Sequence, residues 1–177
     1  MTSKVFPWGT KVSPAFRAKV IQLCKNLNWT DNHASWLMGC MAFESGETFS
    51  ANIQNAAGSG AIGLIQFMPA TAKGMNTTTL CLSRITPEEQ LDYVEQYFKP
   101  YASKIKSLND MYMAILLPKY VGKPDSSVLF SGGVSYRQNS GLDKNKDGLV
   151  TKAEACQKVL EKLLKGMTET YRSEWPE

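Results

Sequence analysis

The sequence is poor in the residues that bind transition metals. It contains a single histidine, His33, and its four cysteines include no Cys-x-x-Cys pair. Because zinc sites in proteins are built mainly from clustered cysteines and histidines, we expect no zinc site. Cys24 and Cys40 lie within apolar helical patterns, which favours buried free thiols in a protein made in a reducing cytoplasm.

Long hydrophobic runs and strong charge are also lacking. The longest apolar run, residues 111–117, falls far short of the roughly 20 residues that a membrane-spanning helix needs. Residues 1–14 contain no apolar stretch of signal-peptide length. The net charge of +4 is mild, and no basic cluster alternates with aromatic residues, so nucleic-acid binding is not expected.

The helix signals, by contrast, are strong. A chain of 177 residues with 43% hydrophobic residues is long enough for one domain with a core. Apolar spacing and capping signals predict a mostly α fold, as a single domain over residues 1–177. The expected caps are Ser13, then Thr30 or Asp31, then Thr86 with Glu89 in a capping box. Helices are expected over about residues 14–27, 31–45, 69–72, 86–99, 108–117 and 151–165, with a loop over 119–142.

Glu44 is the first candidate catalytic residue. It lies at the C-terminal end of the second predicted helix, where the helix dipole disfavours a negative charge. The neighbouring Met41 and Phe43 predict partial burial, which also raises the pKa of a carboxyl group. A carboxyl that stays protonated near neutral pH can donate a proton to the leaving oxygen of a glycosidic bond. The alternative is a glutamate that faces solvent at a helix end.

A glycine-rich segment follows, over residues 52–74. Gly58, Gly60 and Gly63 allow backbone conformations that other residues rarely adopt, so a small hairpin or an irregular loop is expected. Gln66 and the backbone groups of this segment either line a groove that binds a sugar, or belong to a buried hairpin in which the glutamine is incidental.

One family resemblance is specific. The pair Glu44-Ser45, followed by Gly-Leu-Ile-Gln-Phe-Met-Pro-Ala-Thr-Ala over residues 63–72, resembles the lytic transglycosylase family, which is related to goose-type lysozyme. The resemblance is strong over about residues 30–75 and weaker beyond. It implies a lysozyme-like fold in which Glu44 is the general acid and base, Ser45 contacts the substrate and Gln66 lines the glycan groove.

The family also has an Ala-Tyr-Asn-x-Gly stretch whose tyrosine lies near the catalytic glutamate, and this sequence lacks that string. Tyr112 is the preferred counterpart, because it lies on a predicted helix as the tyrosine of the family does. Packing in the core is the other explanation of Tyr112. Tyr136 lies in a polar stretch that either contacts sugar or forms a surface turn.

Most glycosidases use two carboxylates. Glu47 is the nearest candidate for a second carboxylate, but the Ser45-Gly46 break is expected to turn it to solvent. Asp110 and Glu95 are the other candidates that the sequence leaves. The resemblance implies chemistry that needs only one carboxylate and no cofactor. The glutamate protonates the bond between N-acetylmuramic acid and N-acetylglucosamine, then accepts the C6 hydroxyl proton as that oxygen closes on C1 to give a 1,6-anhydro end.

Residues 143–154 match the twelve-residue calcium-binding loop of EF-hand proteins, with Gly148 at the sixth position. No entering helix is expected, because residues 135–142 have the composition of a loop. The segment either binds a structural divalent ion, with calcium as the candidate, or forms a metal-free turn held by Asp and Asn side chains. The candidate ligands are Asp143, Asn145, Asp147, the backbone carbonyl of Leu149, and Glu154.

These features predict a bacteriolytic enzyme that acts as a monomer on peptidoglycan, as a phage endolysin or a virion-associated enzyme does. Without a signal peptide, such an enzyme is made in the host cytoplasm and reaches the periplasm and cell wall after release. The last helix carries Lys158, Lys162 and Lys165, and either touches the envelope or simply buries one face. The alternatives are a hydrolytic muramidase on the same fold and a non-enzymatic calcium- or glycan-binding module.

Overall fold

The computed structural model describes residues 4–177, so the first three residues of the N-terminal stretch lie outside it. Over this range the prediction of a mostly helical chain is confirmed. The α-helices are α1 (Pro14–Asn26), α2 (Asp31–Glu44), α3 (Pro69–Gly74), α4 (Thr79–Arg84), α5 (Pro87–Phe98), α6 (Leu108–Leu116), α7 (Gly133–Asn139) and α8 (Lys152–Gly166). The 3-10 helices are η1 (Gly9–Lys11), η2 (Lys99–Lys104), η3 (Pro118–Tyr120) and η4 (Ser140–Leu142). The strands are β1 (Val5–Phe6), β2 (Val128–Ser131), β3 (Leu149–Thr151) and β4 (Ser173–Glu174).

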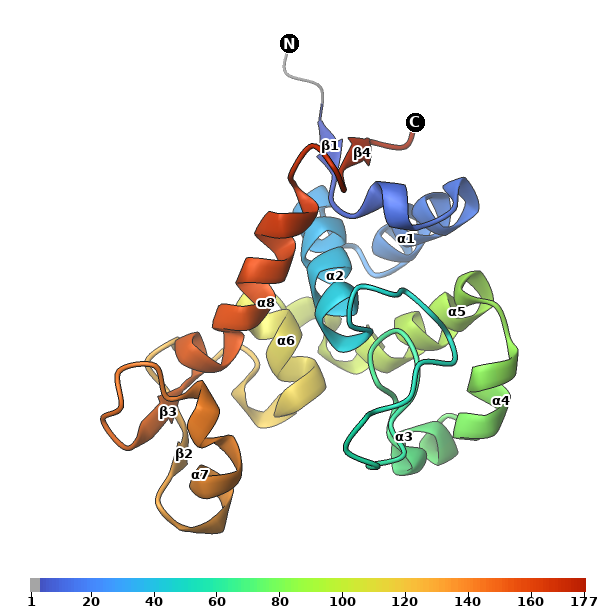
Figure 1. The fold of residues 1–177 in the computed structure, drawn as a ribbon. Helices are drawn as coiled ribbons and strands as arrows, with labels where there is room; N and C mark the ends of the chain where they lie inside the picture. The colour runs from blue at the N-terminus through green and yellow to red at the C-terminus, as the bar shows by residue number, and fades with distance from the viewer. Residues whose placement is uncertain (1–3) are drawn as a thin grey trace.

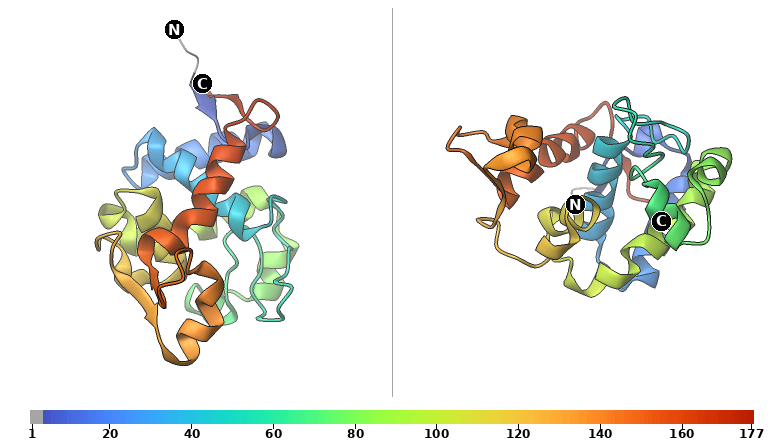
Figure 2. Two further views of the ribbon diagram at one scale, coloured as in Figure 1. Left: turned by 60° about the vertical axis from the view of Figure 1, so that its left-hand side comes forward. Right: turned by 90° about the horizontal axis from the view of Figure 1, so that it is seen from below.

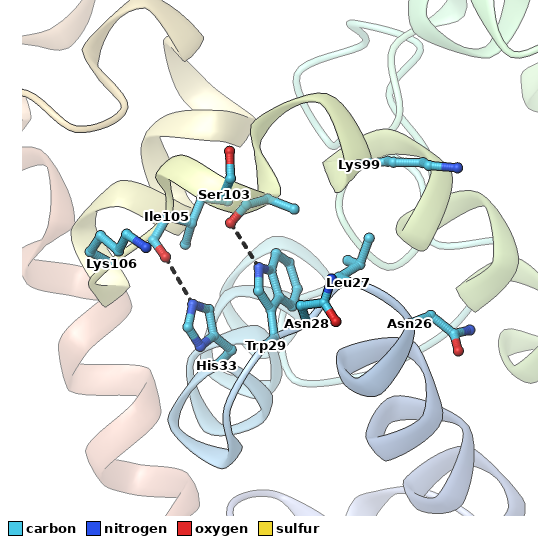
Figure 3. Close-up of a pocket in the computed structure, with 10 residues that line it drawn as sticks. Asn26, Leu27, Asn28, Trp29, His33, Lys99, Ser103, Ile105 and Lys106 are labelled. Carbon is cyan, nitrogen blue, oxygen red and sulfur yellow. Dashed lines mark hydrogen bonds between the residues drawn. The ribbon is translucent and has the colours of Figure 1, made fainter.

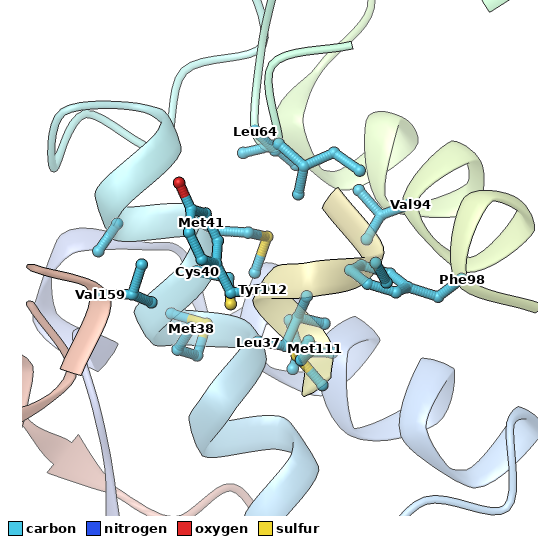
Figure 4. Close-up of a cluster of buried hydrophobic side chains, with 14 of the residues drawn as sticks. Leu37, Met38, Cys40, Met41, Leu64, Val94, Phe98, Met111, Tyr112 and Val159 are labelled. Carbon is cyan, nitrogen blue, oxygen red and sulfur yellow. The ribbon is translucent and has the colours of Figure 1, made fainter. Parts of the chain in front are cut away.

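Helix α2 is the central element of the fold (Figure 1). Most of its side chains are buried, as expected for a helix that other elements surround. It packs against α8, α6 and α1, and a methyl group added at Gly39 would come within 2.9 Å of the Leu163 side chain on α8. Figure 4 shows Met38, Cys40 and Met41 of α2 within the core that these helices share. Cys40, like Cys24, is a buried free thiol, as predicted.

The helices begin at the residues whose side chains satisfy their first backbone amides. Ser13 Oγ accepts a hydrogen bond from the Phe16 amide at 3.0 Å. Thr86 and Glu89 form the predicted capping box, with bonds of 2.9 and 3.1 Å. Of the two candidate caps of α2, the structure uses Thr30, whose amide donates to Nδ1 of His33 at 3.1 Å.

The two ends of the described chain meet at one pole of the molecule (Figure 1). Strand β1 pairs with β4 in antiparallel fashion, with Val5 opposite Glu174. Trp8 follows β1, is fully buried, and donates its indole N–H to the carbonyl of Lys162 on α8 at 3.0 Å. This closure fixes the C-terminal half of α8 against the body of the protein.

The prediction of a loop over residues 119–142 is wrong. This stretch contains η3, β2, α7 and η4, and β2 pairs with β3 in antiparallel fashion. The reason is non-local, because β2 pairs with residues 149–151, which follow α7 and η4 in the chain. The pair β2–β3 and helix α7 form a small unit at the N-terminal end of α8 (Figure 2).

The glycine-rich segment forms an irregular loop that is held by two isolated bridges, Gln54 with Ile62 and Ile62 with Phe67. Helix α3 then starts at Pro69, as predicted, and α4 was not predicted. Among residues 4–177, none of the helices combines the length and the apolar character that spanning a membrane requires.

Candidate active site

A cavity of about 310 Å³ lies at the C-terminal end of α2. Its walls are the last residues of α2, the turn that follows them, and the glycine-rich loop. Glu44 is the one carboxylate among the described residues that line this cavity, and the side-chain amides Gln54, Asn55 and Gln66 line it as well. The structure therefore brings together the predicted acid and the predicted groove glutamine.

Glu44 is half-buried, and its helix ends at this residue, as predicted. Burial raises the pKa of its carboxyl group from 4.5 to about 7. A carboxyl with this pKa is protonated in a large fraction of molecules at neutral pH, so it can donate a proton and then accept one. The alternative of a freely solvated glutamate does not fit this burial.

Gln66 presents its amide to the cavity in a fixed orientation. Its Nε2 donates to the carbonyls of Ile53 and Gly63, both at 3.2 Å, so Oε1 is the end that remains to accept a bond from a ligand. The backbone of Gln66 has a φ angle of +55°, a left-handed conformation that non-glycine residues adopt only where other contacts hold it. The bridge between Ile62 and Phe67 supplies that constraint.

Ser45 lies beside Glu44, but its side chain supports the backbone. The residue is 1% exposed, and its Oγ accepts a hydrogen bond from the Phe49 amide at 3.0 Å. The hydroxyl that the resemblance assigns to substrate contact thus braces the turn that forms one wall of the cavity.

Gln90 anchors the glycine-rich loop and was not singled out in the sequence. It is fully buried on α5, where its Oε1 accepts from the Leu64 amide at 2.8 Å. Its Nε2 donates to the carbonyls of Ala51 and Leu82, both at 3.0 Å. A side chain at Gly63 would collide with this amide. A polar residue beside Leu91 on the apolar face of its helix was the signal that could have identified it.

Of the two candidate tyrosines, the structure brings Tyr112 close to Glu44. Tyr112 is 6% exposed on α6, packs edge-on against Phe43 at 5.6 Å, and directs its hydroxyl towards the C-terminal end of α2 (Figure 4). Burial, and then the charge of Glu44, raise the pKa of Tyr112. Tyr136 lies elsewhere, on α7, where its hydroxyl donates to Asp143 at 2.7 Å.

The other candidate carboxylates have structural partners. Glu47 does not turn to solvent as predicted, since it forms ion pairs with Lys162 and Lys165 of α8. Hydrogen bonds from these two lysines lower the pKa of Glu47. Asp110 pairs with the buried Lys152 at 2.6 Å, and Glu95 accepts a hydrogen bond from the side chain of Asn26.

The loop over residues 143–154 has the entering helix that the sequence did not reveal. Helices α7 and η4 precede the loop, and α8 follows it. Asp143 Oδ2 accepts from the Gly148 amide at 2.9 Å, and Asn145 Oδ1 accepts from the Asp147 amide at 3.1 Å. Glu154 Oε1 accepts from the Lys144 amide at 3.2 Å. This last bond joins the last residue of the loop to its second residue, Lys144.

The donor chemistry of this loop fits a hard divalent cation. Its candidate ligands are carboxylate, amide and carbonyl oxygens, the set that calcium prefers. The same bonds also fit the metal-free turn, because each side-chain oxygen named above already accepts from a backbone amide. No group of three or more His, Cys, Asp or Glu side chains within residues 4–177 is arranged to hold a metal ion.

A larger cavity, of about 440 Å³, lies at the opposite end of α2. Figure 3 shows Trp29 and His33 in this cavity, where they bond the carbonyls of Ala102 and Ile105 at 3.0 and 2.8 Å. His33 Nδ1 accepts from Thr30, so both ring nitrogens are engaged. These hydrogen bonds join the start of α2 and the residues before it to η2 and Ile105.

Comparison of the chain with protein families, with curated proteins and with solved structures finds no match in any of the three.

Proposed function

We propose that this protein is a lytic transglycosylase that cleaves the glycan strands of bacterial peptidoglycan. The observation that carries the proposal is the position of Glu44, a half-buried carboxyl with a pKa of about 7, in a cavity that is otherwise lined by amide, hydroxyl and apolar residues. Sugars are bound through their hydroxyl and N-acetyl groups, for which amide side chains are suitable partners.

Glu44 is proposed to act twice. It first protonates the oxygen that links N-acetylmuramic acid to N-acetylglucosamine, which breaks the bond and leaves Glu44 as a carboxylate. The carboxylate then takes the proton of the C6 hydroxyl as that oxygen bonds to C1, and a 1,6-anhydro ring results. Gln66, with Oε1 turned to the cavity, would accept a hydrogen bond that orients the sugar.

A single carboxylate favours this reaction over hydrolysis. Hydrolytic glycosidases place a second carboxylate about 5 to 9.5 Å from the acid. The carboxylates of Glu47 and Asp110 are held by lysine ammonium groups instead, and neither residue lines the cavity. A hydrolytic muramidase on the same fold would need a catalytic carboxylate from elsewhere. A bacteriolytic role for a phage, with release into the periplasm and cell wall, remains the setting that we propose.

The pH dependence of activity tests this proposal. Because Glu44 must carry a proton at the start of the reaction, kcat/KM on purified Gram-negative peptidoglycan should be constant below pH 7 and should fall above about pH 7. The rate of release of soluble muropeptides between pH 5 and 9 measures this, with a rough tenfold loss per pH unit on the alkaline side. Activity that keeps rising to pH 9 would contradict Glu44 as the proton donor.

We further propose that the loop over residues 143–154 binds calcium as a structural ion, held by Asp143, Asn145, Asp147, the carbonyl of Leu149 and Glu154. The observation that favours it is the presence of helices on both sides of the loop. Calcium would brace the start of α8 and take no part in the reaction.

Calcium should therefore raise the thermal stability. At about 100 times the dissociation constant the gain is about 2.7 kcal/mol, or roughly 5–10 °C in Tm for a chain of this size. Asp147→Asn keeps the shape of the loop and an oxygen ligand but removes one negative charge, so it should weaken the shift while leaving the Tm without calcium nearly unchanged. An equal Tm with and without about 10 mM calcium would rule out the site, since EF-hand affinities are rarely weaker than about 1 mM.

In the basic helix, Lys162 and Lys165 form ion pairs with Glu47, whereas Lys158 is exposed and forms no salt bridge within residues 4–177. Helix α8 buries one face in the core, through residues that include Val159 and Leu163. A weak contact with the envelope through this helix is thus a minor part of the proposal.

A further inference from the structure

The chain turns sharply directly after Glu44, over residues 45–49. Gly46, Glu47 and Phe49 have positive φ angles of 59°, 68° and 49°. Two of the three are not glycine, and such residues keep a left-handed conformation only where surrounding contacts impose it. We call this segment the 45–49 turn.

Hydrogen bonds tie the 45–49 turn to the last turn of α2. The Glu47 and Gly46 amides donate to the carbonyls of Ala42 and Phe43 at 2.7 and 3.3 Å, and within the turn itself the Phe49 amide donates to Ser45 Oγ at 3.0 Å. Thr48 Oγ1 donates to the carbonyl of Ser45 at 2.7 Å. A displacement of the turn would therefore displace the end of the helix that carries the proposed acid.

Two residues of the turn do not line the cavity: Phe49, which is buried in the core, and Glu47. Residues 43–46 and 48 line the cavity of Glu44, but Glu47 does not. Its carboxylate instead contacts the ammonium groups of Lys162 and Lys165 on α8, the latter at 2.7 and 2.9 Å. The cavity is thus on one side of this wall, and a cluster of three charges fixes the wall from the other side.

The part of α8 that carries the two lysines is itself held firmly. The carbonyl of Lys162 accepts the indole N–H of Trp8 at 3.0 Å. The ammonium of Lys165 lies 5.4 Å from the centre of the Tyr171 ring and 5.8 Å from that of Trp8. The Glu47 side chain is 20% exposed, so its ion pairs are less screened than those of fully solvated groups.

We propose that Glu47, Lys162 and Lys165 form an ionic latch that positions Glu44, because it holds the wall of the cavity against α8. Glu47 is thereby a positioning residue and not a second catalytic carboxylate. The expected effect of the latch on the reaction rate rests on the proposed lytic activity. The positioning of Glu44 by the latch does not. When the latch opens, the 45–49 turn loosens, water reaches Glu44, and fewer molecules hold the acid in its productive place.

Two sets of variants separate this latch from a simple effect of charge. Three other titratable groups, Cys40, Tyr97 and Tyr112, interact with the charge of Glu44. Burial keeps all three neutral at pH 7, so they do not change their charge during the titration of Glu44. Charge alone predicts that Glu47→Gln lowers the pKa of Glu44, whereas removal of both lysines raises it. A loosened wall hydrates Glu44 in both cases, so the latch predicts a lower pKa in both.

The first measurement is an NMR titration of the Glu44 carboxyl carbon in the full-length protein. In Glu47→Gln and in Lys162→Gln with Lys165→Gln, its pKa should fall by roughly 0.5 to 1 unit. Asp92→Asn, which removes the exposed pair with Lys19, is the matched control and should leave the titration unchanged. Shifts in opposite directions, or no shift, would overturn the latch whether or not the protein is lytic.

The second measurement is the rate of muropeptide release. Both latch variants should lower kcat by about tenfold at an unchanged KM, less than the roughly hundredfold that a 1 Å misplacement of reacting groups costs. The variant with Lys162→Arg and Lys165→Arg keeps both positive charges and should keep a kcat near that of the wild type. Wild-type kcat in Glu47→Gln would contradict the latch, whereas an inactive wild-type protein would contradict only the proposed function.

Discussion

Replacing Glu44 by glutamine should lower kcat on peptidoglycan by about 1,000-fold, within the range that removal of a positioned general acid gives. Glutamine has nearly the same size but can neither donate the first proton nor accept the second. The release of soluble muropeptides from purified sacculi measures the loss. Because the cavity keeps its shape and its amides, binding of glycan fragments should be largely retained.

The same substitution should stabilise the protein, which separates lost catalysis from lost folding. The folded state holds the Glu44 proton more tightly than the unfolded chain, so wild-type stability falls as pH rises from 4.5 to about 7. Glutamine removes this cost, so Glu44→Gln should be about 1 to 3 kcal/mol more stable at pH 8 and nearly equal to wild type at pH 4. Retained lytic activity would remove Glu44 from the mechanism.

The largest loss of stability is expected from Lys152→Met. Lys152 is 1% exposed, and its ammonium donates to Asp110 at 2.6 Å and to the carbonyls of Tyr120 and Lys123 at 3.1 and 2.8 Å. Methionine fills the space but leaves the carboxylate of Asp110 buried without its counter-charge. Such a change costs about 3 to 5 kcal/mol, which urea unfolding at pH 7 measures.

The pH dependence of this loss is a second test of the ion pair. Burial alone would raise the pKa of Asp110, but hydrogen bonds from Lys152 and from the amides of Lys106 and Gly122 outweigh it, so the pKa is lowered. Because the pKa of Asp110 is lower in the folded than in the unfolded protein, the carboxylate stabilises the fold at pH values above its ordinary pKa of about 3.9. This stabilisation is lost as the pH falls through the pKa of Asp110 in the folded state. Wild type should therefore lose stability below about pH 4, and Lys152→Met much less. As a control, Asp110→Asn combined with Lys152→Met should recover part of the lost free energy of unfolding. A Lys152→Met protein as stable as wild type at pH 7 would contradict the account.

The local parts of this fold could be predicted from the sequence. Ser13 and the Thr86–Glu89 capping box place helix starts through bonds that span three residues, and the structure forms them. Glu44 was identified by its place at a helix end beside apolar residues. The same local reasoning predicted that Gln66 follows in an irregular glycine-rich segment.

The parts that sequence reasoning missed depend on residues far apart in the chain. Strand β2 exists because it pairs with β3, and the loop over residues 119–142 looked unstructured without that partner. Glu47 was expected to face solvent because its partners, Lys162 and Lys165, lie more than a hundred residues away. Tyr112 was already preferred over Tyr136 from the sequence, but its contact with Phe43 depends on the packing of α6 against α2, which the sequence did not show.

The chemistry of the cut ends tests the central claim most directly. Purified Gram-negative peptidoglycan is digested with the wild-type protein and with Glu44→Gln, and the released muropeptides are weighed by mass spectrometry. The account predicts 1,6-anhydro ends, each lighter by one water than a reducing end, in the wild-type digest and none with the variant. Reducing ends in the wild-type digest would contradict it, because they require a water nucleophile and a second carboxylate that the cavity of Glu44 does not offer.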